Sequence, residues 1–295
     1  MAFGDLMDVT NRLLVHAQAL AAVGARLQLD EDRSVGDPAV RAQLDRVIDA
    51  LEVRDHLDAL SDEERTMLLS FTRSYLTQAL DLVNDPARAG TWSQDNPTLL
   101  QAQGSASGGV ARLVSAAGLG HDGARILDVG TGVAGLAIAL CNTYPAATVV
   151  GIDPFGPALA IARRNVSEAG LESRITLHET TIEDFDDSDG FDLVWLPSFF
   201  IPEGVLDDAI ARIFALTRPG GAVVVGVLYS GEGDPLAGAV DDLFTVRAGG
   251  SVLYPEAAVA RLNQAGFSDS REIPRTWDAP IRLVVGTRAE SAVQA

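Results

Sequence analysis

The chain has 295 residues, of which 22 are basic and 41 acidic, giving a formal net charge of −19 at pH 7. All the basic residues are arginines, so mechanisms that need a lysine, such as a pyridoxal phosphate Schiff base or a Walker-A phosphate loop, are excluded. The acidic balance argues against nucleic acid or an anionic membrane as partner, because both bind basic faces. The single cysteine, Cys141, excludes an internal disulfide and a cysteine-based zinc site.

The start of the chain carries Asp5 and Asp8 where a secretory signal would be basic. No apolar run approaches the ~20 residues of a membrane span. We therefore expect a cytoplasmic protein.

The first hundred residues show apolar residues at helical spacing and no convincing strand. One helix is expected over about residues 4–27. Apolar residues that share one helix face predict a second, namely Val40, Leu44, Val47, Ile48 and Leu51. Ser61 followed by Glu64 is a capping-box pattern that opens a third. Residues 84–104 are rich in turn formers and predict a connector of the kind that serves as a lid.

From about residue 105 the pattern changes to strands alternating with helices. Strands are expected at 125–129, 148–153, 175–178, 191–196, 222–229, 269–273 and 281–287. Helices are expected at 110–118, 133–143, 156–168, 203–217, 236–246 and 255–265. This alternation predicts βαβ units and a parallel sheet. We therefore divide the chain into a helical region with its connector, 1–104, and an α/β domain, 105–295.

The most informative stretch follows the first expected strand. Gly130, Gly132 and Gly135 fit Gly-x-Gly-x-x-Gly between a strand and a helix, where glycines allow a tight turn and close approach to a ligand. The second strand ends at Asp153, where a carboxylate can accept both hydroxyls of a ribose. Because Pro154 follows it, a helix N-cap is the alternative role of Asp153. This order of elements predicts an adenosine-containing cofactor: a strand, the glycine motif, a helix, a second strand and an acidic residue.

Two such cofactors compete, NAD and S-adenosylmethionine, and Asp128 favours the second. It lies in the strand, two residues before Gly130. A carboxylate is unfavourable beside a pyrophosphate but favourable beside a sulfonium or an ammonium group. The first βαβ unit also starts about 120 residues into the chain, and no second nucleotide-binding half is evident. An NAD-dependent oxidoreductase is the alternative.

These features resemble class I S-adenosylmethionine-dependent methyltransferases over about residues 101–288. Residues 128–132 look like the first motif of that family, whose backbone cradles the methionine part of the cofactor, and Asp153 matches its ribose-binding acid. The resemblance implies a Rossmann-like seven-stranded sheet, mostly parallel with a reversed C-terminal strand and helices on both faces. It further implies that the preceding all-α domain is a lid or dimerisation domain, so that a homodimer forms through these helices.

The resemblance also implies the site residues. Those for the cofactor are Asp128, Gly130, Thr131, Gly132, Asp153, Pro154, Ile182, Glu183 (or Asp184 in its place) and Leu196. Those for the acceptor, in the aromatic loop after the fourth strand, are Trp195, Ser198, Phe199 and Phe200. The alternative for this loop is packing beneath the helical domain.

The implied reaction is methyl transfer to a hydroxyl or phenol of a small molecule in natural-product biosynthesis. Tyr229, at the end of the fifth strand, and His16 are the candidate catalytic residues. Metal-dependent catechol-type relatives carry an aspartate where Leu196 stands, so we expect no catalytic metal. A non-methylating protein that keeps the cofactor, such as a cyclase or a regulatory subunit, is a further alternative.

Overall fold

The computed structural model describes residues 3–32, 36–88, 90, 97–229, 234–277 and 281–290. The chain divides into two units, Met1–Pro86 and Ala87–Ala295. The expected boundary at residue 104 falls inside a helix of the second unit, α5 (Pro97–Ala116). Residues 89 and 91–96 of the expected connector lie outside the described residues, so its role as a lid stays a prediction.

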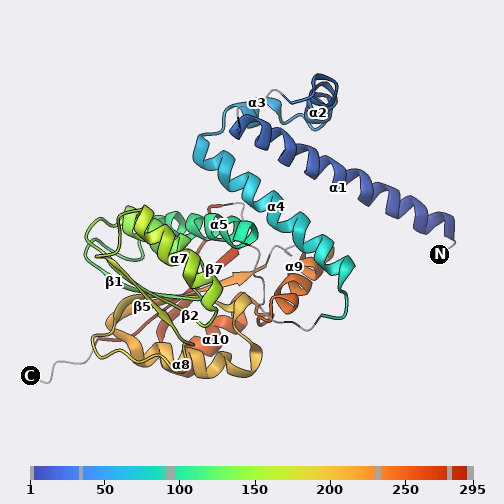
Figure 1. Ribbon diagram of the computed structural model, residues 1–295. Coiled ribbons are helices and arrows are strands. Elements are labelled where there is room, and N and C mark those ends of the chain that lie inside the picture. Colours follow the sequence, from blue (N-terminus) through green and yellow to red (C-terminus); the bar gives the residue numbers. More distant parts are fainter. Residues whose placement is uncertain are drawn as a thin grey trace, which may run out of the picture. The chain divides into compact units, whose positions relative to one another are not determined.

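The described part of the first unit is helical (Figure 1). Its helices are α1 (Phe3–Glu31), α2 (Pro38–Ala50), α3 (Arg54–Asp58) and α4 (Asp62–Asn84). Helix α1 packs against α2 and α4. The capping box predicted at Ser61 and Glu64 is confirmed, because the Ser61 hydroxyl accepts from the Glu64 amide and the Glu64 carboxylate accepts from the Ser61 amide.

The apolar core of this unit is small. It consists of four buried aliphatic side chains, Leu27, Ile48, Leu57 and Leu69. Of the five apolar residues expected on one face of α2, only Ile48 is fully buried, and Val40 remains 58% exposed. A unit of fewer than about 90 residues buries a smaller fraction of its surface than a large domain, so part of the apolar face of α2 stays exposed.

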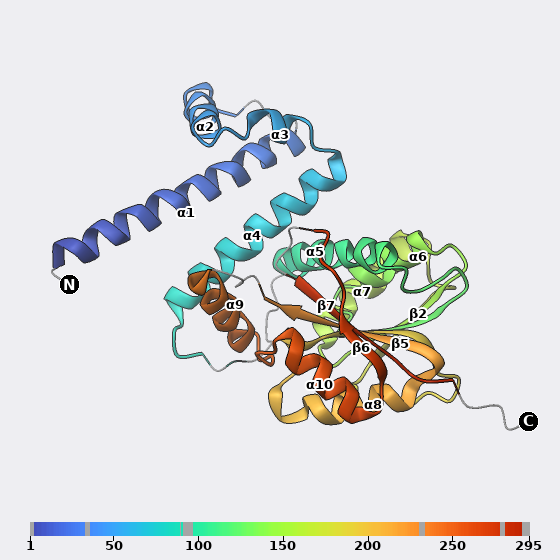
Figure 2. The ribbon, with the colours of Figure 1, turned by 180° about the vertical axis from the view of Figure 1, so that it is seen from behind.

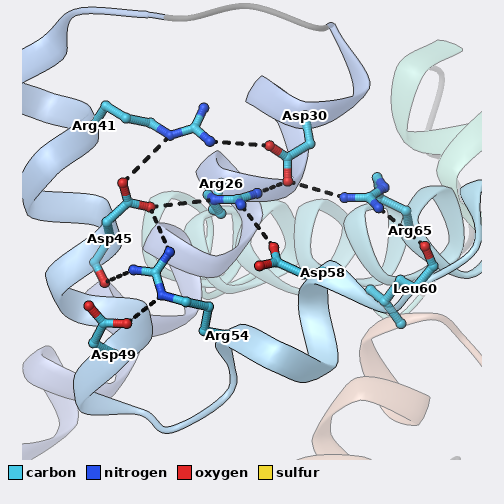
Figure 3. A network of polar contacts seen from close by, with 9 residues as sticks. All are labelled: Arg26, Asp30, Arg41, Asp45, Asp49, Arg54, Asp58, Leu60 and Arg65. Carbon is cyan, nitrogen blue, oxygen red and sulfur yellow. Dashed lines mark hydrogen bonds and ion pairs between the residues drawn. The ribbon is translucent and has the colours of Figure 1, made fainter.

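Ion pairs replace much of the missing apolar core (Figure 3). The Arg26 guanidinium is buried and contacts the carboxylates of Asp30, Asp45 and Asp58, which come from three different segments. The network continues through Arg41 and Arg65 to Asp30, through Arg41 and Arg54 to Asp45, and through Arg54 to Asp49. Arg26 is therefore the central cation that ties α1 to α2 and to the end of α3.

The second unit is built on a seven-stranded sheet in the order β3-β2-β1-β4-β5-β7-β6. The strands are β1 (Arg125–Val129), β2 (Thr148–Asp153), β3 (Ile175–Glu179), β4 (Phe191–Pro197), β5 (Thr217–Leu228), β6 (Ser268–Glu272) and β7 (Ile281–Thr287). Strand β7 runs antiparallel to β5 and β6, and the pairs among β1 to β5 are parallel. The predicted sheet with a reversed C-terminal strand is confirmed.

Helices cover both faces of this sheet (Figure 2). On one face lie α5, α6 (Gly135–Thr143) and α7 (Gly156–Glu168), and on the other α8 (Leu206–Leu216) and α10 (Pro255–Ala265). Helix α9 (Pro235–Arg247) follows β5. The inner strands are buried on both sides, as expected for strands covered by two helical layers.

The sheet order reverses at β1, which pairs with β2 on one side and β4 on the other. In open α/β sheets, ligands bind outside the carboxyl ends of the strands at such a reversal. The loops after β1, β2 and β4 therefore define where a site should lie.

Candidate functional site

The loop after β1 has a backbone that only glycine adopts readily. Gly130 and Gly132 have φ values of +67° and +55°, in the left-handed region. The third glycine, Gly135, is required for a different reason, since a Cβ there would overlap the carbonyl oxygen of Gly104 in α5. The glycine motif thus combines a tight turn with close contact between two helices.

Asp128 lies beneath this loop. Its side chain is 1% exposed and accepts a hydrogen bond from the Thr131 hydroxyl at 2.7 Å. Burial, the largest cause, raises the pKa of this carboxyl to about 7. Its expected contact with the sulfonium stays a prediction.

Asp153 lies at the rim of the same loop. Its carboxylate accepts from the Gly132 amide at 2.9 Å and from the Phe155 amide at 2.8 Å. Burial raises the pKa of Asp153, and these two amides act in the opposite direction. The N-cap of α7 is Phe155, so Asp153 fixes the turn before that helix instead of capping it.

A cavity of about 580 Å³ opens over these loops. Eight of the predicted site residues line it: Gly130, Thr131, Gly132, Asp153, Pro154, Ile182, Glu183 and Phe200. The open choice between Glu183 and Asp184 favours Glu183, because Asp184 pairs with the Thr181 hydroxyl and is not among the lining residues. Residues far apart in sequence thus meet where the sheet order predicts.

Other predicted residues lie away from the cavity. Trp195 is buried in the sheet and its ring packs on Gly226, while the Ser198 hydroxyl donates to the Gly226 carbonyl oxygen at 2.8 Å. Leu196 is fully buried in the core on the α8 side, and Phe199 packs edge-on against Phe200. The cause is that both faces of β4 are covered, so side chains at its end enter the core.

The two catalytic candidates are also separate from the cavity lining. The Tyr229 ring packs edge-on against Tyr254, with centroids 5.4 Å apart, and the Arg282 guanidinium lies 5.7 Å from the Tyr229 ring centroid. Residues 230–233, which follow Tyr229, lie outside the described residues. His16 is an exposed residue of α1 in the first unit, and its Nδ1 lies 2.7 Å from the Arg12 carbonyl oxygen. The catalytic roles of both remain predictions.

Helix α5 supplies lining residues that sequence reasoning missed. They are Leu100, Gln103, Gly104 and Ser107. The turn formers of residues 84–104 predict a connector, whereas the structure has a helix from Pro97. Its signal was the pair Gly104 and Gly108, one helical turn apart, which lets α5 approach the loop closely.

Within the described ranges, no three His, Cys, Asp or Glu side chains gather as a set of metal ligands. No helix in the part of the chain covered by the structure is long and apolar enough to cross a membrane.

The fold and the site define a Rossmann-like domain with a cavity at the carboxyl ends of β1 and β2, the place where open α/β sheets bind their ligands. Residues 126–221 match the family described as "Methyltransferase domain". Residues 126–221 of the second unit are therefore similar to a methyltransferase domain, the class of domain for which S-adenosylmethionine is the methyl donor.

Part of this domain is similar in sequence to a curated methyltransferase. The demethylmenaquinone methyltransferase of Thermus thermophilus is 38% identical over 101 residues, which are 34% of this chain and 46% of that protein. The chain thus spans less than half the length of this curated relative.

The fold of the whole chain has counterparts among solved structures. An O-methyltransferase family protein from Burkholderia thailandensis covers 99% of both chains with a TM-score of 0.66 and 16% identity. Human N-acetylserotonin methyltransferase, solved with S-adenosylmethionine, has a TM-score of 0.65 and 16% identity over 96% of this chain and 98% of that one. At this identity the likeness concerns the fold.

Proposed function

We propose that the protein transfers a methyl group from S-adenosylmethionine to a hydroxyl or phenol of a small, partly apolar molecule. One observation carries the proposal: a single cavity joins polar groups suited to adenosine with an apolar wall suited to an acceptor. The O-methyltransferase named among the structural neighbours supports the choice of oxygen as acceptor.

The adenosine side is formed by residues after β2 and β3. Asp153 is placed to accept the ribose hydroxyls, since its buried carboxylate lines the cavity. Ile182 and Glu183 flank the same side and would contact the adenine through backbone and side chain. Gly130, Thr131 and Gly132 would cradle the methionine part.

The acceptor side is formed by the loop after β4 and the turn after α9. Phe200, Ile201, Pro202, Val205 and Ala248 line it. Methyl transfer by in-line displacement needs alignment and exclusion of water, which an apolar wall provides. We place the acceptor ring against Phe200, whereas Trp195 and Ser198 support the loop from the core.

The direct experiment incubates the protein with S-adenosylmethionine and a panel of phenols and hydroxylated aromatic compounds. A product heavier by one methyl group supports the proposal, and Tyr229→Phe tests whether that hydroxyl takes part. Loss of most turnover in the variant, with cofactor binding intact, would support a catalytic role for Tyr229. Turnover of the variant at the wild-type rate would contradict that role.

The alternatives give different results in a thermal shift assay. A ligand that binds the folded protein raises its melting temperature. A rise with S-adenosylhomocysteine and none with NAD agrees with the proposal, and the reverse indicates an oxidoreductase. Cofactor binding without turnover across the panel indicates a cyclase or a regulatory subunit.

We further propose a homodimer through the N-terminal helices. Helix α1 carries exposed apolar side chains at helical spacing, among them Phe3, Leu6, Leu13 and Leu14. Such a row is unusual on a monomer surface and suits a second copy of the same helix. Light scattering should give twice the chain mass, and Leu13→Glu with Leu14→Glu should give the monomer. A monomeric wild-type protein would contradict this proposal.

A further inference from the structure

Helix α5 presents a short polar face to the cavity beside the glycine loop. Gln103 and Ser107 are four residues apart and therefore share one face of the helix. Both are partly buried and both line the cavity. The position of this face is fixed, because a Cβ on Gly104 would overlap the Val133 side chain and one on Gly135 would overlap the Gly104 carbonyl oxygen.

The two side chains differ in their hydrogen bonding. The Ser107 hydroxyl donates to the Gly104 carbonyl oxygen at 2.9 Å, which leaves its oxygen free to accept a further bond. The Gln103 side chain makes no hydrogen bond to any residue that the structure describes. A partly buried amide with no partner among the described residues is suited to bind a polar ligand.

The topology indicates which part of the cofactor would reach this face. Asp153 and Glu183 come after β2 and β3, on one side of β1, and the apolar acceptor wall comes after β4, on the other side. A cofactor with its ribose on Asp153 and its sulfonium toward the acceptor wall has its amino-acid end over the loop after β1. That loop is where α5 packs.

The charges of the cavity limit which groups can bind the carboxylate at the amino-acid end of the cofactor. Among the lining residues that the structure describes there is no arginine, lysine or histidine, and the ionisable side chains are Asp153 and Glu183. The carboxylate of the cofactor therefore needs neutral donors. The Gln103 amide group is such a donor on the cavity wall.

We propose that Gln103 and Ser107 bind the amino-acid end of S-adenosylmethionine, with the Gln103 amide donating to the carboxylate and the Ser107 oxygen accepting from the ammonium group. This inference rests on the proposed function for its ligand. It assigns to α5, a helix outside the glycine motif, the recognition of the part of the cofactor that 5′-methylthioadenosine lacks.

The test uses two ligands that differ in that part. S-adenosylhomocysteine carries the amino-acid end and 5′-methylthioadenosine does not. Isothermal titration of the full chain should show that Gln103→Leu weakens S-adenosylhomocysteine about tenfold or more, as expected for a lost hydrogen bond to a charged group. Gln103→Glu should weaken it further, because it places a carboxylate beside a carboxylate. Ser107→Ala should give a smaller loss, and all three variants should bind 5′-methylthioadenosine as the wild type does.

Ser105→Ala is the matched control, since Ser105 is an exposed residue of the same helix whose hydroxyl donates to the Gln101 carbonyl oxygen. It should bind both ligands normally. Equal losses for the two ligands, or no loss for S-adenosylhomocysteine in Gln103→Glu, would overturn the inference. If the wild type binds neither ligand, the proposed function fails instead, so the two failures are distinguishable.

Discussion

The two units of the chain bury their side chains in different ways. The first unit has four buried aliphatic residues in its core and places the Arg26 guanidinium beside them. The second unit has an extended apolar core on each face of its sheet. Two of its buried charged residues, Asp128 and Asp153, lie at the glycine loop, and Asp241 and Arg282 are buried in α9 and β7. The difference teaches that a buried cation joins the helices of the first unit, whereas apolar packing forms the core of the second unit and two of its buried carboxylates lie at the glycine loop.

This contrast has an energetic consequence. A buried ion pair roughly offsets the cost of removing its charges from water, but removing one partner leaves the other charges unpaired. The first unit should therefore be sensitive to single charge changes, and the second to changes in packing. The predictions below test this in order of decreasing effect.

The largest effect should come from Arg26→Met. The substitution leaves the carboxylates of Asp30, Asp45 and Asp58 without their shared cation, and we expect it to destabilise the first unit by about 3–5 kcal/mol. Hydrogen exchange read by mass spectrometry should show faster exchange in α1 to α4 and unchanged exchange in β1 and β2. Arg46→Met is the control, because the exposed Arg46 donates to Gln43 and has no other polar partner among the residues that the structure describes, and it should change stability by less than about 0.5 kcal/mol. Similar exchange in the two variants would show that the network contributes little.

A pH-dependent effect should follow from Asp128→Asn. The folded-state pKa of Asp128 is about 7 against an ordinary 3.8, so the folded wild type keeps a proton that the unfolded chain loses. The unfolding free energy of the wild type therefore falls as pH rises from about 4 to 7, and Asn removes this dependence. The stability of the variant relative to the wild type should increase across this window, by on the order of 3 kcal/mol. Denaturant titrations at several pH values measure it, and a constant difference would contradict the buried, proton-retaining carboxyl.

A packing effect should come from the same substitution made in both units. Gly135→Ala forces a methyl group onto the Gly104 carbonyl, and we expect a loss of about 1–3 kcal/mol. Gly4→Ala in α1 meets nothing within 4 Å, and should stabilise its helix by up to about 1 kcal/mol. Denaturant midpoints measure both changes. Equal effects of the two substitutions on stability would contradict the close contact between α5 and α6.

The sequence permits prediction of those features that depend on local spacing. The glycine loop and Asp153 were found because strand, turn and acid follow one another along the chain, and the structure brings them to one cavity. The seven-stranded, mostly parallel sheet with a reversed C-terminal strand followed from the resemblance to a known family and is confirmed.

What the sequence did not reveal depends on long-range packing. Gln103 was missed because helix propensity over 97–109 is low and the close contact with α6 selects glycine there. The directions of Trp195 and Ser198 were not predictable, because both faces of β4 are covered and alternation then carries no signal. The Arg26 network joins segments whose contacts no local pattern indicates.

The central claim is that the cavity over β1 and β2 binds S-adenosylmethionine through Asp153. Isothermal titration with S-adenosylhomocysteine, on the wild type and on Asp153→Ala side by side, tests it most directly. We expect one site per chain in the wild type and about 100-fold weaker binding in the variant, since a charged acceptor of two hydroxyls is lost. No binding to the wild type, or equal affinity in the two proteins, would contradict the account.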